Sequence, residues 1–247
     1  MEIGRYLKNI RIENFFSDKD FAWLTDLKFG DFTENNLNSD KIVHKDIDNG
    51  NKTHKVMAMY HNYPVCPNEE TLNYIKAGHI KKDYELVKKV FYIVRNTLDK
   101  HFPFIKLETI NLHALESIQP YTIHHDWNQQ HHDNVKNKAW TIIIPFDVSK
   151  SHTIVFKQQP KYQKSKAMTD WVEIEQPPII DKISDDDYNT YLSHTDREHC
   201  RYLEIDDIYK WEENTAFAAS RYNFHCSDNF LKYGYSSKKA IVMWTSF

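Results

Sequence analysis

The sequence is poor in glycine and cysteine. Only 5 of its 247 residues are glycine, and none belongs to a phosphate-binding glycine pattern. Neither a Rossmann fold nor a P-loop is therefore expected. The 3 cysteines, Cys66, Cys200 and Cys226, are a sparse, odd set without a CxxC pair, so they predict neither a disulfide framework nor a structural zinc site. Such sparse cysteine is typical of a reducing cytoplasm, and we expect a cytoplasmic location.

Long hydrophobic runs and an excess of positive charge are also missing. The N-terminal segment MEIGRYLKNIRIENFF lacks the apolar stretch of a signal peptide, and no stretch approaches the length of a transmembrane helix. With 32 basic and 35 acidic residues the formal net charge is −3, which gives no global positive field for nucleic acid. We therefore expect no membrane or nucleic-acid partner, and a monomer or homodimer.

The first hundred residues indicate helices. Ser17-Asp18 offers an N-cap for a helix that begins near residue 18. The strongest signal is an amphipathic helix from Asp83 to His101. Its apolar stripe comprises Leu86, Val90, Ile93, Val94, Thr97 and Leu98. Around these helices we expect a strand at 10–16, a loop or weak strands at 30–55, and a strand at 56–60.

From residue 107 onward the hydrophobic pattern changes to a period of two, which predicts strands. The expected strands are 107–115, 119–126, 139–147, 153–158, 171–175, 215–225 and 238–247, with an acidic, loop-like stretch at 176–214. Helices followed by a run of strands predict an α+β, mainly β fold with a sandwich, barrel or jelly roll. Aromatic residues, 14% of the chain, favour strands as well.

No repeat or Pro/Gly-rich linker divides the chain, so we expect one domain over residues 1–247. Within that domain the pattern predicts helical support at roughly 17–105 and a β core at roughly 107–247.

The segment His124-His125-Asp126 and the distant His225 contain a candidate set of metal ligands. Residues two apart on an extended strand point to the same side, so His124 and Asp126 can offer a nitrogen and an oxygen to one ion. His225 lies 101 residues later, at the end of another expected strand. Two imidazoles and one carboxylate are the ligands of the 2-His-1-carboxylate facial triad, which leaves positions open on iron(II).

Other histidines compete for the same interpretation. The chain has 14 of them, so a chance His-x-Asp is not rare. The segment His131-His132-Asp133 contains the same spacing, and adventitious metal binding by this cluster is an alternative. We favour His124 and Asp126 because they end a recognisable strand, whereas residues 128–138 have the composition of a polar loop. His125 is expected to face away from the metal.

Five segments form an ordered set along residues 10–247. They are IENFFSDKDFAWL, the amphipathic helix, the strand that reaches HHD, RYNFHCSD, and the terminal strand KKAIVMWTSF. In this order they resemble the 2-oxoglutarate/iron(II)-dependent oxygenase superfamily, and its prolyl-hydroxylase-like branch most. The resemblance implies a double-stranded β-helix (jelly-roll) core with N-terminal flanking helices and a variable insertion at roughly 160–214. It also implies iron(II) held by His124, Asp126 and His225, with 2-oxoglutarate and dioxygen as co-substrates and ascorbate as an accessory reductant.

In that superfamily a basic residue on the strand after the distal histidine holds the remote carboxylate of 2-oxoglutarate. No arginine follows His225, but Lys238 stands six positions before Trp244, as the family's basic residue does before a Trp-like position. A lysine neutralises the carboxylate without the bidentate fork of arginine. Lys239 is the alternative, and only one of the two points inward, since neighbours on a strand alternate faces.

Further polar residues are candidates for the co-substrate pocket that the resemblance implies. Asn111 and His113 share a face of the strand before HHD, and Tyr121 carries a hydroxyl. Each could hydrogen-bond 2-oxoglutarate, and the alternative is a core polar residue that a neighbour satisfies. Arg221 could anchor an acidic group in the mouth, although we favour an ordinary surface salt bridge.

The resemblance implies an enzyme that couples oxidative decarboxylation of 2-oxoglutarate to hydroxylation of a substrate. Because Asp126 provides a carboxylate ligand, no position is vacated for chloride, and hydroxylation is favoured over halogenation. A peptidyl residue is slightly favoured as the substrate over a small molecule. The alternatives are a cupin-like metal-binding jelly roll, which the scarcity of glycine disfavours, and a catalytically inactive binding protein with the same fold.

Overall fold

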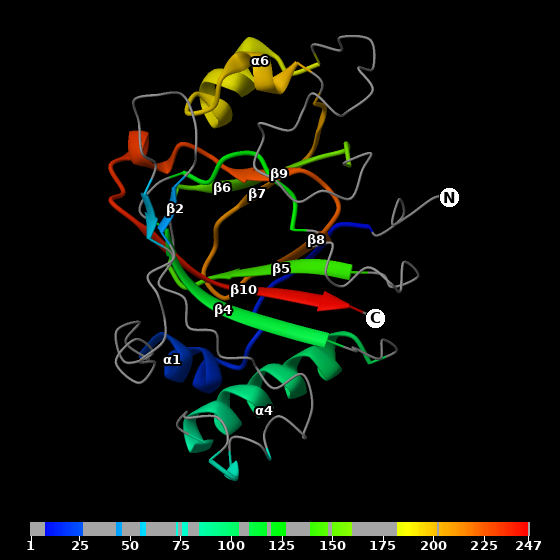
Figure 1. Ribbon diagram of the computed structural model, residues 1–247, viewed down its shortest axis with the longest axis vertical. Coiled ribbons are helices and arrows are strands. Elements are labelled where there is room, and N and C mark those ends of the chain that lie inside the picture. The colour runs from blue at the N-terminus through cyan, green and yellow to red at the C-terminus, as the bar shows by residue number, and fades with distance from the viewer. Residues whose placement is uncertain are drawn as a thin grey trace.

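The described part of the chain forms four layers, which follow one another from top to bottom in Figure 1. Short helices lie above a three-stranded sheet, a five-stranded sheet lies below it, and two longer helices cover the lower face. The structure is a computed structural model. It describes residues 8–26, 43–45, 55–57, 73, 76–78, 84–103, 109–117, 120–126, 139–147, 150–159, 182–201 and 203–246.

The larger sheet is antiparallel throughout. Its strands are β1 (Ile10–Ile12), β4 (Thr109–Ser117), β5 (Ala139–Pro145), β8 (Ala216–Ser220) and β10 (Lys238–Ser246). Their order across the sheet is β1-β8-β5-β10-β4. The C-terminal strand β10 therefore lies inside the sheet and pairs with β4 on one side and β5 on the other.

The smaller sheet is also antiparallel and has the order β7-β6-β9, where the strands are β6 (His152–Phe156), β7 (Ile205–Lys210) and β9 (His225–Ser227). From β5 onward the chain passes from the larger sheet to β6 and β7, back to β8, across to β9 and back to β10. These crossings bring residues distant in sequence together between the sheets. A separate antiparallel pair consists of β2 (Val43–Lys45) and β3 (Lys55–Met57).

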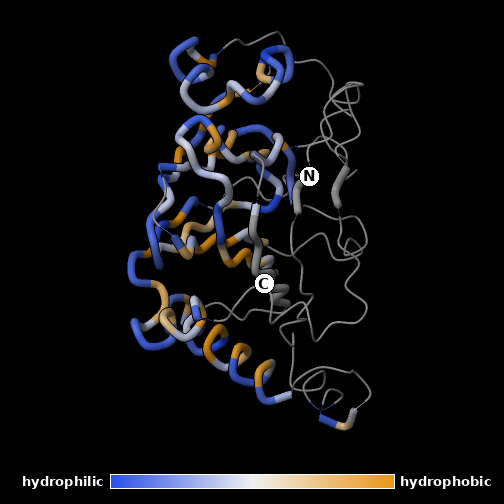
Figure 2. Tube along the Cα trace, turned by 90° about the vertical axis from the view of Figure 1, so that its left-hand side faces the viewer, coloured by the Kyte–Doolittle hydropathy of each residue, from blue (hydrophilic) through white to orange (hydrophobic). Residues whose placement is uncertain are grey.

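Helices α1 (Asp18–Asp26) and α4 (Tyr84–His101) cover the outer face of the larger sheet. The hydroxyl of Ser17 accepts the backbone N–H of Asp20 at 3.2 Å, which confirms the predicted N-cap. Figure 2 shows hydrophobic and hydrophilic residues alternating along α4, as its predicted stripe requires. The buried helix residues pack against alternate residues of the strands, among them Trp140, Ile142, Ile144, Ile241 and Met243.

The opposite faces of the same strands pack against the smaller sheet. Because successive side chains of a strand point to opposite faces, Ile143 of β5 and Ala240 of β10 turn away from the helices. They join a cluster between the sheets with Val155 of β6 and Tyr209 of β7. The space between the two sheets is therefore partly filled by apolar side chains, and the remainder is a cavity described below.

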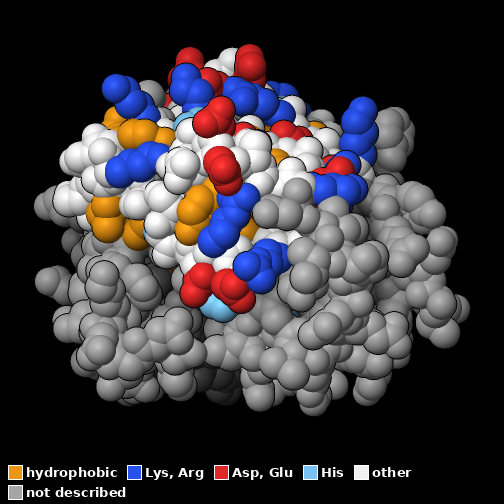
Figure 3. All heavy atoms as spheres, turned by 90° about the horizontal axis from the view of Figure 1, so that it is seen from above, with side chains coloured by type: hydrophobic (Ala, Val, Ile, Leu, Met, Phe, Trp, Pro, Cys, Tyr) orange, Lys and Arg blue, Asp and Glu red, His pale blue; other side chains and the backbone are white. Residues whose placement is uncertain are grey.

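A second helical layer covers the smaller sheet. It contains α5 (Asp185–Asp187), the π-helical turn η3 (Tyr188–Leu192) and α6 (Arg197–Cys200). Leu192 and Leu203 pack there on Ile154 and Phe156 of β6. Figure 3 looks down on this layer and shows basic and acidic side chains interspersed on its surface. The predicted loop at 176–214 is wrong over residues 182–210, because apolar residues order these helices and β7 pairs with β6.

Two predicted strands differ from the structure in a way that matters for the site. In place of the strand predicted at 119–126, the described residues 120–126 form an isolated bridge between His124 and His225. One further bond to β9 runs from the N–H of Ser227 to the carbonyl of Tyr121. Residues 215–225 divide into β8 and β9, which lie in different sheets and are separated by a turn closed from Asn223 N–H to the Ser220 carbonyl.

The other strand predictions hold in part. The strand expected at 10–16 shortens to β1, while those at 107–115, 139–147, 153–158 and 238–247 correspond to β4, β5, β6 and β10. Residues 171–175 and most of 56–60 lie outside the described residues, and the single domain stays a prediction. Within the described part of the chain, no helix combines the length and apolar character needed to cross a membrane.

Candidate metal centre and adjoining cavity

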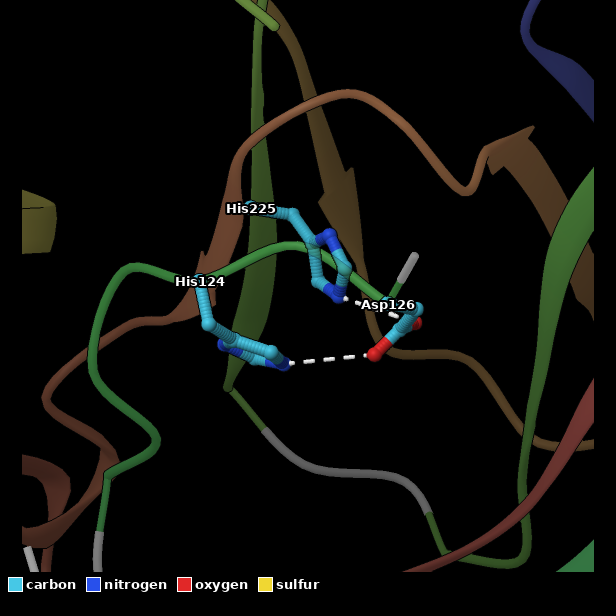
Figure 4. Close-up of side chains that lie close together, drawn as sticks. All are labelled: His124, Asp126 and His225. Carbon is cyan, nitrogen blue, oxygen red and sulfur yellow. Dashed lines mark ion pairs between the residues drawn. The ribbon is translucent and has the colours of Figure 1, made fainter. Parts of the chain in front are cut away.

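His124 and His225 are brought together by their backbones. They form an isolated antiparallel bridge in which the N–H of His124 donates to the carbonyl of His225 at 2.9 Å and the reverse bond measures 2.8 Å. Paired residues of neighbouring strands project to the same side, and the ring centroids are 4.3 Å apart. Figure 4 shows both imidazoles turned toward Asp126.

Each imidazole is held by the same local hydrogen bond. Nδ1 of His124 lies 2.7 Å from the carbonyl oxygen of Thr122, and Nδ1 of His225 lies 3.1 Å from the carbonyl oxygen of Asn223. Because a carbonyl oxygen only accepts, Nδ1 carries the proton in both neutral rings and Nε2 keeps its lone pair. A bond of this kind fixes the tautomer and the ring orientation of metal-binding histidines.

The Asp126 carboxylate completes the group. Its Oδ1 lies 3.6 Å from Nε2 of His124, and its Oδ2 lies 3.3 Å from Nε2 of His225. One ligand atom from each of the three residues lies within 4.8 Å of the others, the only such group of three or more among the residues that the structure describes. Thr141 Oγ1 donates to Asp126 Oδ2 at 2.5 Å and so fixes the carboxylate from β5.

The charges of the three residues are strongly coupled. Burial and the neighbouring His225 lower the pKa of His124 to about 4, so that His124 is a neutral donor at physiological pH. Burial acts to raise the pKa of Asp126, but His225, His124 and the bond from Thr141 outweigh it and hold this pKa far below its usual range. Burial acts to lower the pKa of His225, and the Asp126 carboxylate outweighs it, so this pKa is raised.

Arg221 is tied to Asp126 rather than to a surface acid. Its guanidinium Nη2 donates to the Asp126 carbonyl oxygen at 2.9 Å, while the Asp126 N–H donates to the Arg221 carbonyl oxygen at 3.1 Å. Burial lowers the pKa of Arg221. The favoured interpretation of Arg221 as an ordinary surface salt bridge is therefore wrong, because the β8–β9 turn folds this side chain over the backbone of Asp126.

A cavity of about 120 Å³ lies between the two sheets and is lined by all three residues of the group. Strand β10 contributes every second residue of one wall, as the pleat requires: Lys238, Ala240, Val242 and Trp244. Tyr121 also lines the cavity, and its ring centroid lies 4.6 Å from that of His124. Most of the lining surface is apolar, and among the described residues its acidic, basic and histidine side chains are those of Lys238 and the three residues of the metal group.

Lys238 is the buried cation of this cavity, with 3% of its surface exposed. Its ammonium group lies 3.9 Å from the ring centroid of Trp211 and donates to the hydroxyl of Ser151 at 3.0 Å. Burial lowers the pKa of Lys238 to about 8, and the nearby Asp228 opposes this shift. Lys239, the alternative, is half-buried and follows on the opposite face of β10.

The remaining candidates from the sequence are Asn111, His113, His125 and the competing segment at 131–133. The backbones of Asn111 and His113 pair in register with Trp244 and Val242, which line the cavity. His125 is buried away from the metal group, where its ring centroid lies 5.6 Å from that of Phe224. The competing segment at 131–133 lies outside the described residues.

Comparisons with known proteins give distant structural likenesses only. No family model matches the sequence, and no curated protein matches it. EvdO2 from Micromonospora carbonacea var. aurantiaca is 13% identical, with 99% of this chain and 86% of that chain covered and a TM-score of 0.42. The epimerase SnoN, in complex with Fe³⁺, alpha ketoglutarate and nogalamycin RO, is 8% identical over 98% of this chain and 78% of that chain, with a TM-score of 0.46.

The non-heme alpha ketoglutarate dependent carbocyclase SnoK from nogalamycin biosynthesis is similar to the same degree. It is 10% identical, with 99% of this chain and 80% of that chain covered and a TM-score of 0.46. Identities and TM-scores of this size leave the chemistry of this chain to be argued from its own residues.

Several residues of the site have no signature in the sequence. Thr141, Ser151 and Trp211 come from three separate segments, and each contacts a candidate site residue. Asp228 stands three residues after His225 in HCSD, so an acid close to a candidate ligand was the one available signal. The packing of the two sheets, rather than any spacing along the chain, brings these side chains together.

Proposed function

We propose that this chain is an iron(II)- and 2-oxoglutarate-dependent dioxygenase that hydroxylates its substrate, and that its two sheets form a double-stranded β-helix. One observation carries the proposal. His124, Asp126 and His225 converge on a cavity whose wall also holds the buried cation Lys238. A metal-binding face and a cation in one small cavity suit a ligand that chelates at one end and is anionic at the other.

The donor set fits iron(II). Two neutral imidazole nitrogens and one carboxylate oxygen are the ligands of the facial triad, which leaves coordination positions open for co-substrates. The Nδ1–H bonds to the carbonyls of Thr122 and Asn223 keep both Nε2 lone pairs directed at the metal. The bond from Thr141 holds the carboxylate beside the two imidazoles, where Asp126 would bind the metal.

The cavity fits 2-oxoglutarate. Its volume is about 120 Å³, and Lys238 keeps two of its three ammonium protons after donating one to Ser151. The apolar side chains of Ile143, Val242 and Trp244 also line the cavity, and apolar walls disfavour water. Exclusion of water strengthens the attraction between the ammonium group and a carboxylate.

When bound, iron(II) supplies the activation of dioxygen by which 2-oxoglutarate becomes succinate and carbon dioxide while one oxygen atom enters a substrate C–H bond. The residues of this chain bind the metal on one side, orient the co-substrate through Lys238 and exclude water. For the primary substrate, the resemblance in sequence slightly favours a peptidyl residue over a small molecule. The same resemblance supports ascorbate as an accessory reductant.

Succinate release tests the proposal. Purified protein with iron(II), 2-oxoglutarate, ascorbate and dioxygen should form succinate, and His124→Ala or Asp126→Ala should abolish this. Lys238→Ala should raise the KM for 2-oxoglutarate, with Lys239→Ala as the matched control. Full succinate production by His124→Ala would show that the metal assignment is wrong.

An anaerobic titration separates the alternatives. Iron(II) and 2-oxoglutarate together should give a visible absorption band that neither gives alone. Metal binding without that band and without succinate supports a cupin-like or inactive protein. A screen of peptides against free metabolites, scored by the mass gain of one oxygen atom, then decides the substrate class.

A further inference from the structure

We infer that Asp228 is a positioning residue that acts through Ser151 to hold and orient Lys238 for an anionic co-substrate. The inference rests on the proposed function, because it concerns how the lysine assigned to 2-oxoglutarate is held. Asp228 has no exposed surface, and Ser151 has none either. Two fully buried polar residues behind a cavity lysine are costly unless each is paired, and here they are paired with one another.

The hydrogen bonds run in one direction. The Lys238 ammonium donates to Ser151 Oγ at 3.0 Å, and Ser151 Oγ donates to Asp228 Oδ1 at 2.7 Å. A hydroxyl has a single proton, so the bond to the carboxylate leaves Ser151 with only lone pairs for Lys238. Asp228 therefore sets the polarity of Ser151, and Ser151 in turn fixes where the ammonium group sits.

The second oxygen of Asp228 is fixed as well. Nδ1 of His152 donates to Asp228 Oδ2 at 2.9 Å, and the Asp228 N–H donates to the carbonyl of His152 at 3.1 Å. The ring of His152 lies edge-on to Tyr191 of η3, with centroids 5.1 Å apart. The carboxylate thus accepts from Ser151, which directly precedes β6, and from His152, the first residue of β6, so that both of its oxygens are engaged.

The surroundings of Lys238 leave Asp228 as its main counter-charge. Apolar rings flank the ammonium group, with Trp211 at 3.9 Å and Phe230 at 5.2 Å from it. Burial lowers the pKa of Lys238 to about 8. Three groups act to raise the pKa of Lys238 again. The strongest is Asp228, followed by Cys226 on β9 and Asp147 after β5. Without the Asp228 charge the amine would lose its proton at lower pH, and an anionic ligand would lose its partner.

The first experiment needs neither metal nor co-substrate. NMR of isotope-labelled lysine side chains, with Lys238 assigned by its loss in Lys238→Met, follows the titration of Lys238 in the full-length protein. We expect a midpoint near pH 8 in the wild type and a lower midpoint in Asp228→Asn and in Ser151→Ala. The shift in the double variant should be smaller than the sum of the two single shifts, because Asp228 acts in part through Ser151. Asp186→Asn, at an exposed position, is the control.

The second experiment measures 2-oxoglutarate binding by anaerobic calorimetry with iron(II) bound. Loss of a hydrogen bond to a charged group predicts a dissociation constant about ten- to a hundredfold higher in Asp228→Asn. As pH rises, the affinity for 2-oxoglutarate should begin to fall at a lower pH in Asp228→Asn than in the wild type. The affinity for iron(II) should not change. Ser151→Thr keeps the hydroxyl and should bind 2-oxoglutarate more tightly than Ser151→Ala.

The outcomes distinguish the inference from the function on which it rests. An unshifted Lys238 titration in Asp228→Asn and Ser151→Ala overturns the inference, even if the wild type binds 2-oxoglutarate. A shifted titration in a protein that does not bind 2-oxoglutarate overturns the proposed function and leaves the positioning of Lys238 by Asp228 supported. If Asp228→Asn does not fold, Ser151→Ala decides by the same two measurements.

Discussion

His124 and His225 exchange both of their backbone hydrogen bonds, so the two candidate ligands are paired with each other before any metal binds. The pairing depends on main-chain atoms and not on the imidazoles. Each ring is then aimed by its own Nδ1–H bond to a carbonyl two residues earlier. The geometry of the centre is therefore built into the fold, and a side chain can be removed from it without removing the bridge.

This separation of backbone and side chain predicts the behaviour of His124→Ala. The variant should unfold at nearly the wild-type temperature, because the bridge to His225 persists. Its iron(II) affinity should fall by more than about a hundredfold, since even the outer partners of metal ligands contribute about ten- to a hundredfold. Anaerobic metal titration and thermal unfolding measure the two effects. His125→Ala, whose ring faces away from the metal group, should keep the affinity.

Thr141 should affect the iron(II) affinity of the centre although it is not itself a candidate ligand. Thr141→Val keeps the shape of the side chain but removes the 2.5 Å hydrogen bond to Asp126 Oδ2. The carboxylate then loses one of the groups that fix it, and iron(II) affinity should fall by about ten- to a hundredfold. Thr141→Ser retains the hydroxyl and should restore most of the affinity. Equal affinity in both variants would show that this hydrogen bond is not needed.

Burial of Lys238 should make stability depend on pH. Its pKa falls from 10.5 to about 8 in the folded protein, so the unfolded chain binds more protons between these values. The free energy of unfolding should therefore gain about 3 kcal/mol as pH rises from 8 to 10.5, and lose it again as pH falls. Lys238→Met lacks this contribution. Urea unfolding, measured below pH 8 and again near pH 10.5, checks this prediction. Between the two pH values, the free energy of unfolding of Lys238→Met should fall by about 3 kcal/mol relative to that of the wild type.

Asn214 should be essential for attaching the N-terminal segment. Its side-chain amide accepts the N–H of Phe16 at 2.9 Å and donates to the carbonyl of Phe16 at 3.0 Å, in a buried position. Its φ of 52° lies in the left-handed region that asparagine tolerates better than most residues. Asn214→Ala should cost about 2–4 kcal/mol, because two buried backbone groups lose their partners.

A second variant separates the two roles of Asn214. Asn214→Gly relieves the backbone conformation but still lacks both side-chain hydrogen bonds, so it should be destabilised nearly as much as Asn214→Ala. Urea unfolding measures both. A glycine variant with wild-type stability would mean that the backbone conformation, and not the contact with Phe16, is what the asparagine provides.

The elements that depend on local periodicity were predicted well from the sequence. The stripe along α4 and the cap at Ser17 appear in the structure because helix burial and capping involve residues three or four apart. Strand β10 likewise follows its alternating pattern. The strand predicted at 119–126 is wrong over residues 120–126, which pair with β9 only at the bridge between His124 and His225. A partner 101 residues away is not revealed by local sequence.

For the site, residue type and spacing named His124, Asp126 and His225, and the family resemblance named Lys238. The structure places all four at one cavity. The sequence could not name the groups that fix them. Asp126 is held by Thr141 and Arg221, which are 15 and 95 residues away. Lys238 is held by Ser151, 87 residues away. Partners so distant become neighbours only when the two sheets pack.

The sequence by itself determined which ligand types are present and which local elements form, because these follow from the chemistry and periodicity of neighbouring residues. The tertiary structure alone decided that His124 pairs with His225 and that Asp228 lies behind Lys238. Both relationships depend on the passage of the chain between two sheets. Burial between those sheets, rather than residue identity, is also what shifts the pKa of Lys238 and makes its partners matter.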